Sequence, residues 1–276
     1  MEYPVIDFHV HLVDYDWYRP WVVEWIQEFM EEDFEGVREK YSDPKAFVTL
    51  MDEYGVDYSV VMAEQSPITT GIAGNEKVGR FCAASPRLIP FCTINPHLEA
   101  DPARSLERLV DEFGFRGIKL YPTYNHFYPN APELYPLYGR AQDLGLVVMV
   151  HTGSSIFKGS RIKYGDPVYL DDVAVDFPEL KILLVHSGRG FWYDRAFFLA
   201  RLHPNVYMEI SGLPPKKLLT YFPEFERNAE KIIFGSDWPG LFDVKGNLEA
   251  IRKLEISDRA KGLILGGNAA RVLGLG

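Results

Sequence analysis

The segment Asp7-Phe8-His9-Val10-His11 places a carboxylate and two imidazoles at alternate positions of an apolar run. Because alternate residues of a β-strand point to the same face, Asp7, His9 and His11 are expected on one face, with Phe8 and Val10 on the other. Imidazole nitrogens at this spacing can bind one divalent cation. Two histidines on a strand can also be ordinary surface residues, so the pair alone is a weak indication of a metal site.

Three further chemically active side chains each follow another apolar run at the point where that run ends. His151 follows Val-Val-Met-Val, His186 follows Ile-Leu-Leu-Val, and Asp237 follows Ile-Ile-Phe-Gly-Ser. Taken singly, each of them is as well explained by an ordinary polar residue at a strand end. Four separate runs that end in His, His, His and Asp are improbable as coincidence, and they predict one common site.

The elements that position these side chains are short runs rich in β-branched and aliphatic residues. Strands that are apolar throughout are covered on both faces, which is typical of a parallel sheet. Eight such runs occur in the chain: Val5–Val10, Tyr58–Met62, Leu88–Ile94, Gly117–Tyr121, Leu146–Val150, Ile182–Val185, Val206–Ile210 and Ile232–Phe234.

Segments with a helical spacing of apolar residues separate the runs. Asp101-Pro102 begins one that ends at Gly114, and Asn247 begins another. Eight strands that alternate with helices predict the α/β class and a (β/α)8 TIM barrel, formed by a single domain over residues 1–276. A doubly wound open sheet is the alternative, but His-Leu-Val-Asp replaces the Gly-rich loop that follows the first strand of such a sheet.

Residues 15–42 interrupt this alternation with an insertion dense in Trp, Tyr and Phe. The insertion follows the first strand directly, which places it at the carboxyl ends of the barrel strands, where barrel enzymes have their active sites. One interpretation is an amphipathic helix that packs on the barrel rim. The other is a lid whose aromatic side chains form a wall of the substrate pocket. The same apolar surface could form the contact of a homodimer.

Composition excludes several classes of protein. The chain has 29 Lys and Arg against 39 Asp and Glu, and a net charge of −10 disfavours nucleic-acid binding. No apolar run approaches the roughly 20 residues that span a membrane, and the first residues lack the basic region of a signal peptide. Cys82 and Cys92 have neither zinc-finger nor CxxC spacing and fit a reducing compartment. We expect a cytoplasmic enzyme that acts on a small molecule.

The chain resembles the amidohydrolase superfamily and, within it, the amidohydrolase-related group that includes aminocarboxymuconate-semialdehyde decarboxylase. The His-x-His pair together with Phe-Gly-Ser-Asp-Trp-Pro is fairly specific for the group, though not for one reaction. The matching segments span the chain in order: Val5-Ile-Asp-Phe-His-Val-His, Phe113-Gly-Phe-Arg-Gly-Ile-Lys-Leu-Tyr-Pro, Val150-His-Thr-Gly, Val185-His-Ser-Gly, Phe234-Gly-Ser-Asp-Trp-Pro and Gly267-Asn-Ala-Ala-Arg-Val-Leu.

The resemblance implies a role for each strand-end residue. His9 and His11 match the first-strand metal ligands, and His151 matches the fifth-strand ligand. Asp237 matches the eighth-strand carboxylate, which binds the metal and takes a proton from an attacking water. His186 matches a histidine that contacts water or substrate in single-metal members and binds metal in two-metal members. Three imidazoles, a carboxylate and a water suit one zinc ion, with manganese or iron as alternatives.

Lys119, Tyr121 and Arg189 lie at or just beyond other strand ends and are the expected substrate contacts. A free Lys119 ammonium would hold a substrate carboxylate or a neighbouring one. The alternatives are a structural ion pair or, by resemblance to two-metal members, a carboxylated lysine that bridges two ions. Arg189 fits an anionic substrate group, although an ion pair at the barrel rim explains it equally well. Glu64 and Asn95 are expected to supply hydrogen bonds behind the metal ligands.

Two reactions fit the same residues. In hydrolysis of an amide, ester or lactone, a metal lowers the pKa of its bound water from about 15.7 to about 7. Asp237 would then act as general base, while His186 polarises the carbonyl or protonates the leaving group. The alternative is non-oxidative decarboxylation of an aromatic or unsaturated acid. Hydrolysis comes first because it is the commoner chemistry in the superfamily, and a non-catalytic metal-binding barrel comes last.

Overall fold

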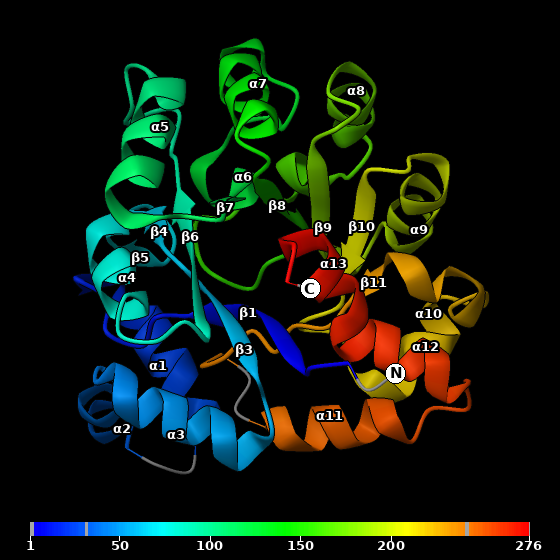
Figure 1. Cartoon of the computed structure of the whole chain (residues 1–276). Coiled ribbons are helices and arrows are strands. Elements are labelled where there is room, and N and C mark those ends of the chain that lie inside the picture. The colour runs from blue at the N-terminus through cyan, green and yellow to red at the C-terminus, as the bar shows by residue number, and fades with distance from the viewer. Residues whose placement is uncertain (1–2, 31–32, 241–242, 276) are drawn as a thin grey trace.

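Eight parallel strands form the centre of the fold in the computed structural model, which describes residues 3–30, 33–240 and 243–275 (Figure 1). The sheet runs in the order β1-β3-β6-β7-β8-β9-β10-β11. The strands are Ile6–His11 (β1), Tyr58–Met62 (β3), Leu88–Thr93 (β6), Gly117–Leu120 (β7), Val147–Gly153 (β8), Lys181–Arg189 (β9), Val206–Glu209 (β10) and Ile232–Ile233 (β11).

Backbone hydrogen bonds join the two edges of this sheet. Phe8 N donates to Phe234 O over 3.1 Å, and His11 N donates to Trp238 O over 2.7 Å, so the segment after β11 pairs with β1. The eight-stranded (β/α)8 barrel predicted from the apolar runs is confirmed, and the strands lie where those runs lie. The single-domain boundaries of 1–276 stay a prediction.

Most helices lie between the strands or follow the last one and form the outer layer of the barrel, whereas the last helix covers one end of it (Figure 1). The helices are α3 (Pro44–Tyr54), α4 (Asn75–Cys82), α5 (Pro102–Phe113), α6 (Pro122–Asn125), α7 (Tyr135–Asp143), α8 (Tyr169–Asp176), α9 (Tyr193–Leu202), α10 (Leu218–Tyr221), α11 (Val244–Arg252), α12 (Asp258–Gly262) and α13 (Asn268–Leu273). Short 3-10 turns cover Pro132–Leu134, Ile162–Gly165, Pro215–Lys217 and Glu226–Lys231, and a π-helical turn covers Leu263–Gly267.

Local sequence explains where these helices begin and end. The Asp101 side chain accepts a hydrogen bond from Arg104 N, Pro102 begins α5, and Gly114 ends it with a φ of 66°. The predicted start of the helix at Asn247 is three residues late, because Asp243 caps α11 instead and the helix begins at Val244.

Two apolar layers hold the barrel together. Side chains that alternate along the strands fill its interior, and α13 packs Ala269, Val272 and Leu273 against that interior core. Figure 1 shows α13 across one end of the barrel, near the chain terminus. The larger apolar cluster lies between the strands and the surrounding helices. The end that α13 leaves open is the one where the predicted site residues lie.

Gly117, at the start of β7, lies where the barrel interior is tightly packed. A Cβ at this position would lie 2.2 Å from the Phe91 ring and 2.6 Å from the Val147 carbonyl oxygen. We expect Gly117→Ala to destabilise the fold by about 1–3 kcal/mol, the range for overpacked cores, measured by urea unfolding. Gly36→Ala is the control, because its Cβ meets nothing closer than 3.8 Å. Equal stability of the two variants would contradict the prediction.

The insertion after β1 forms a small sheet and two helices. Its strand β2 (Trp17–Tyr18) pairs antiparallel with β5 (Gly71–Ala73), which pairs with β4 (Glu64–Ser66). The helices α1 (Pro20–Phe29) and α2 (Phe34–Tyr41) follow β2. The predicted insertion of residues 15–42 thus contains two helices, and its residues 31–32 lie outside the described residues.

The structure also shows the state of the two cysteines and the character of the helices. Cys82 and Cys92 are both free, and both are buried. Among the helices of the described residues, we find none with the length and apolar character needed to cross a membrane.

Candidate active site

A β-bulge in β1 decides which of its side chains reach the site. Three residue steps of β1, from Asp7 to Val10, span two steps of the neighbouring strand β3. Phe8 therefore lies in the barrel interior, whereas Asp7 and Val10 line a small hollow on the outer face, beside α3. The prediction that Asp7 shares a face with His9 and His11 is wrong, because strict alternation holds only in a regular strand.

His9, His11 and Asp237 meet at the open end of the barrel. The Nε2 atoms of the two histidines are 3.2 Å apart, and Asp237 Oδ1 lies 3.2 Å from the first and 3.3 Å from the second. Asp237 follows β11 with a φ of 67°, and its N donates to His9 O over 2.9 Å. The backbone contact that closes the barrel thus brings the carboxylate to the imidazoles.

His151 and His186 face the same cavity from β8 and β9. Their ring centroids are 4.8 Å apart, and the His186 ring is 5.1 Å from that of His9. His151 Nε2 is buried and has no hydrogen-bond partner within the described residues. A buried nitrogen without a partner is costly unless something binds it.

These donors fit a divalent cation. Three of them, one from each of His9, His11 and Asp237, lie within 4.8 Å of one another, which is compact enough for one ion. That cluster does not include His151, whose membership of the ligand set stays a prediction. The unpartnered His151 Nε2 and the N/N/O donor set both favour a metal such as zinc or manganese.

Burial and charge favour the neutral forms of His151 and His186 and the ionised form of Asp237. Burial, and next the positive charge of Arg189, lowers the pKa of His151 and of His186 well below the usual value. Burial would raise the pKa of Asp237, but the contacts with His9 and the other histidines outweigh it and hold that pKa well below its usual range. Neutral imidazoles and an ionised carboxylate are the forms that act as metal ligands. Burial would lower the pKa of His9, but the charges of Asp237 and Glu209 outweigh it and raise that pKa.

A hydrogen-bonded group from the insertion supports His11. Tyr15 OH donates to Glu64 Oε2 over 2.6 Å and lies 3.1 Å from His11 Nδ1, and Thr70 donates to the other Glu64 oxygen. Glu64 thus lies behind His11, as predicted. Asn95 does not, because its side chain donates to the Gln65 backbone instead.

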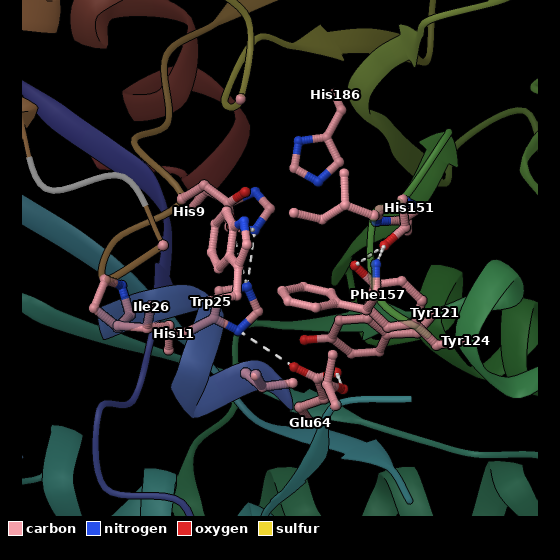
Figure 2. Close-up of a pocket in the computed structure, with 18 of the residues that line it drawn as sticks. His9, His11, Trp25, Ile26, Glu64, Tyr121, Tyr124, His151, Phe157 and His186 are labelled. Carbon is pink, nitrogen blue, oxygen red and sulfur yellow. Dashed lines mark hydrogen bonds and ion pairs between the residues drawn. The ribbon is translucent and has the colours of Figure 1, made fainter. Parts of the chain in front are cut away.

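These residues surround one cavity of about 340 Å³ (Figure 2). Aromatic side chains form much of its wall: Phe157 packs edge to face against Trp25 at 5.3 Å, and Tyr121 stacks on Tyr124 at 5.7 Å. The lining includes all eight predicted site residues and, in addition, three residues of the insertion. These are His9, His11, Lys119, Tyr121, His151, His186, Arg189 and Asp237, with Val22, Trp25 and Ile26 of the insertion.

Two basic side chains of the lining have no acidic partner among the residues that the structure describes. Lys119, at β7, is completely buried, and its Nζ makes no hydrogen bond or ion pair with any described residue. Arg189 donates to the Ser154 carbonyl over 3.0 Å and forms no ion pair within the described part of the chain. The structural ion pairs considered for both residues from the sequence are therefore not present there.

Sequence reasoning missed Glu209, which ends β10 and is completely buried. Its Oε2 lies 3.2 Å from His9 Nδ1, on the ring nitrogen that faces away from Asp237. The signal was an acidic residue within the apolar run Val206–Ile210, because a buried carboxylate requires a partner. Trp25 and Phe157 were also not singled out, since aromatic residues in insertions have many structural roles.

The chain belongs to the amidohydrolase family, whose model matches residues 6–275. It is therefore an enzyme of that family, and the family resemblance read from the sequence motifs is confirmed. A curated relative, 2-amino-3-carboxymuconate-6-semialdehyde decarboxylase from Dictyostelium discoideum, is 23% identical over 240 residues. The match covers 73% of this chain and 65% of the relative, so it spans just under two thirds of that protein.

Similar solved structures support the barrel fold. An uncharacterized TIM-barrel protein from Bordetella bronchiseptica has a TM-score of 0.80 and 24% identity, over 98% of each chain. A 2,6-dihydroxybenzoate decarboxylase in complex with 2,6-dihydroxybenzoate has a TM-score of 0.71 and 18% identity. The match covers 100% of this chain and 99% of that chain. A 5-carboxyvanillate decarboxylase from Novosphingobium aromaticivorans, in complex with manganese, has a TM-score of 0.70 and 16% identity. The match covers 99% of this chain and 96% of that chain.

Proposed function

We propose that this chain is a metal-dependent carboxy-lyase that removes CO2, without oxidation, from an aromatic or unsaturated carboxylic acid. The observation that carries the proposal is the pair of basic side chains, Lys119 and Arg189, that line the cavity without an acidic partner among the described residues. An anionic substrate would supply the negative charge that pairs with these two side chains.

This proposal reverses the order expected from the sequence, where hydrolysis came first. The curated relative and two of the similar structures carry the names of decarboxylases. Their printed substrates are small carboxylic acids, and such a substrate fits a cavity lined by both basic and aromatic side chains. Motifs alone could not separate the two reactions, because both use the same strand-end residues.

We assign the metal to His9, His11, His151 and Asp237, with zinc as the expected ion and manganese as the alternative. When bound, the metal would supply a Lewis acid that holds and polarises oxygen atoms of the substrate. The chain's own residues then act on the rest of the molecule. Lys119 Nζ and the Arg189 guanidinium bind the anionic group, and Tyr121 faces the same space.

The aromatic side chains orient a planar substrate and exclude water. Trp25 from the insertion and Phe157 from the loop after β8 meet across the cavity, as Figure 2 shows. Because Trp25 and Ile26 line the cavity, we propose that the insertion of residues 15–42 serves as its wall or lid. Burial of an aromatic ring between such side chains favours binding through apolar contact and ring packing.

Decarboxylation breaks the bond between the carboxyl carbon and its neighbour, and the electron pair of that bond stays on the neighbour. One proton must be added to this carbon for each CO2 that leaves. His186 and Asp237 are the two candidates for this transfer. His186 Nδ1 lies 2.9 Å from the Ser211 carbonyl oxygen and so carries a hydrogen, which leaves Nε2 free to accept a proton and pass it on.

The decisive experiment measures the products of the metal-loaded enzyme. We expect hydroxybenzoates or unsaturated dicarboxylates to lose the mass of CO2, with CO2 trapped in stoichiometric amount. In a matched panel, a hydrolase would add the mass of one water to a lactone and would split esters and amides into an acid and an alcohol or amine. Turnover of that panel, with no acid decarboxylated, would reject the proposal.

His186→Ala is expected to keep its metal and lose most of its turnover. We expect kcat to fall by roughly tenfold, less than the full contribution of a general acid or base, because Asp237 remains. Metal content by atomic emission and kcat would be measured on the same sample. If metal content falls in proportion to activity, His186 is a ligand and the assignment is wrong.

A further inference from the structure

Glu209 connects three strands behind the metal ligands, outside the cavity. Its Oε2 lies 3.2 Å from His9 Nδ1 of β1 and accepts a hydrogen bond from His186 N of β9 over 3.3 Å. Ser211 N donates to Oε1 over 2.6 Å, and the Ser211 hydroxyl donates to Oε2 over 2.8 Å. The carboxylate is thus surrounded by donors from β1, β9 and its own strand end.

These contacts determine which nitrogen of His9 carries the hydrogen. The Ser211 hydroxyl has one proton and donates it to Glu209, so Oγ can only accept from His9 Nδ1, which lies 2.9 Å away. The Glu209 carboxylate is also only an acceptor. His9 Nδ1 therefore carries a hydrogen, and Nε2, 3.2 Å from Asp237 Oδ1, is the nitrogen left to bind a cation shared with that carboxylate.

The backbone keeps a space for this carboxylate. A Cβ at Gly235 would lie 2.3 Å from Glu209 Oε1 and 2.6 Å from the Cβ of His9. Only glycine at this position allows the chain after β11 to pass while the carboxylate stays behind the imidazole. The glycine of the Phe-Gly-Ser-Asp-Trp-Pro segment and the acid of β10 thus form one arrangement.

We propose that Glu209, with Ser211, is a positioning residue of the metal site: it fixes the ring orientation and the tautomer of His9. A carboxylate behind a metal-binding imidazole orients the ring and makes the free nitrogen a stronger ligand. This inference rests on the metal site at His9, His11 and Asp237, and it does not depend on which reaction the enzyme catalyses.

Metal affinity of Glu209→Gln tests the proposal. The Gln amide keeps the size of the side chain but turns one of its two acceptors into a donor, which faces other donors. We expect the Kd for Zn²⁺, measured by competition with a chromogenic chelator, to rise about 10- to 100-fold. We also expect the visible absorption bands of the Co²⁺-substituted protein to shift, because they report ligand geometry.

Ser187→Ala is the matched control. The buried Ser187 hydroxyl donates to the Glu209 backbone carbonyl over 2.8 Å, so its loss disturbs the same strand end but leaves the carboxylate in contact with His9. Its Zn²⁺ affinity is expected to stay within twofold of the wild type, even where thermal unfolding shows lost stability. An equal loss of affinity in the control would mean that Glu209 acts through packing alone.

A second variant keeps the test decisive if Glu209→Gln does not fold. Glu209→Asp retains the charge but withdraws the carboxylate by one methylene, which takes it out of reach of His9 Nδ1. We expect its Kd for Zn²⁺ also to rise, by about tenfold, which is the lower end of the range for loss of a carboxylate behind a metal-binding histidine. A wild-type Kd in either variant would overturn the proposal. Failure of the wild-type protein to bind Zn²⁺ or Co²⁺ would reject the metal site itself, which is a different result.

Discussion

Replacement of Asp237 with asparagine is expected to lower kcat by about 10²- to 10⁴-fold, the contribution of a positioned acid or base. The carboxylate is assigned both to the metal and to proton transfer, and its Oδ1 lies within 3.3 Å of two histidine nitrogens. Asparagine suits the test because Asp237 has a φ of 67°, a conformation that Asn adopts more readily than most residues. The loss can therefore be attributed to the charge rather than to backbone strain.

The measurement for Asp237→Asn is kcat at saturating metal, with metal content determined on the same sample. Asp243→Asn is the control, because Asp243 caps α11 through Gly246 N and asparagine caps equally well. The control should keep wild-type activity and metal. Turnover of Asp237→Asn within tenfold of the wild type would remove Asp237 from the reaction and from the ligand set.

Strand-end reasoning succeeded because a parallel barrel converts sequence position into spatial position. Each apolar run fixed the end of a strand, and the carboxyl ends of all strands in a barrel meet on one face. His9, His151, His186 and Lys119 could therefore be brought together although their runs are far apart in the sequence. The structure places all four in the lining of one cavity.

The same reasoning failed where local geometry departs from the regular element. Asp7 was placed on the wrong face because the bulge in β1 leaves no mark in the residue pattern. Glu209 was missed because it lies inside an apolar run and was read as part of the strand. The small sheet of β2, β4 and β5 has strands of two or three residues, too short for any periodicity to indicate.

The balance between the reactions depends on electrostatics that motifs do not encode. His151 and Asp237 serve a hydrolase and a decarboxylase equally well. What distinguishes the reactions is whether basic groups near the metal are already neutralised by the protein, and that depends on contacts between β7, β9 and the surrounding loops. In the described structure Lys119 and Arg189 are not neutralised by any ion pair, which is why an acid is the favoured substrate.

Lys119→Met is expected to weaken substrate binding and to strengthen the fold. Met has a similar length and no charge, so it fills the space that the buried lysine occupies. Loss of a buried charge contact to the substrate costs about 3 kcal/mol, and KM should rise by roughly 10²-fold. Lys119→Arg keeps a positive charge and should recover part of the binding, which a group needed only for packing would not show.

The stability effect of Lys119→Met has a defined pH dependence in the metal-free protein. Burial lowers the pKa of Lys119 from 10.5 to about 8, against the opposing charges of Glu209, Asp237 and Glu64. The unfolded chain therefore binds more protons between about pH 8 and 10.5, and wild-type stability rises with pH across that window. Below pH 8 the full penalty, about 3 kcal/mol, is present.

Removal of the charge should abolish that penalty and its pH dependence together. Urea unfolding of the metal-free proteins at pH 7 should show Lys119→Met to be more stable, with the difference shrinking as the pH rises toward 10.5. A carboxylated Lys119 that bridges two ions predicts a different result for the holoenzyme. The wild type would then hold two metals per chain, and both the Met and the Arg variants would lose metal. That outcome would replace the free ammonium, and with it the substrate-carboxylate contact on which the proposed reaction depends.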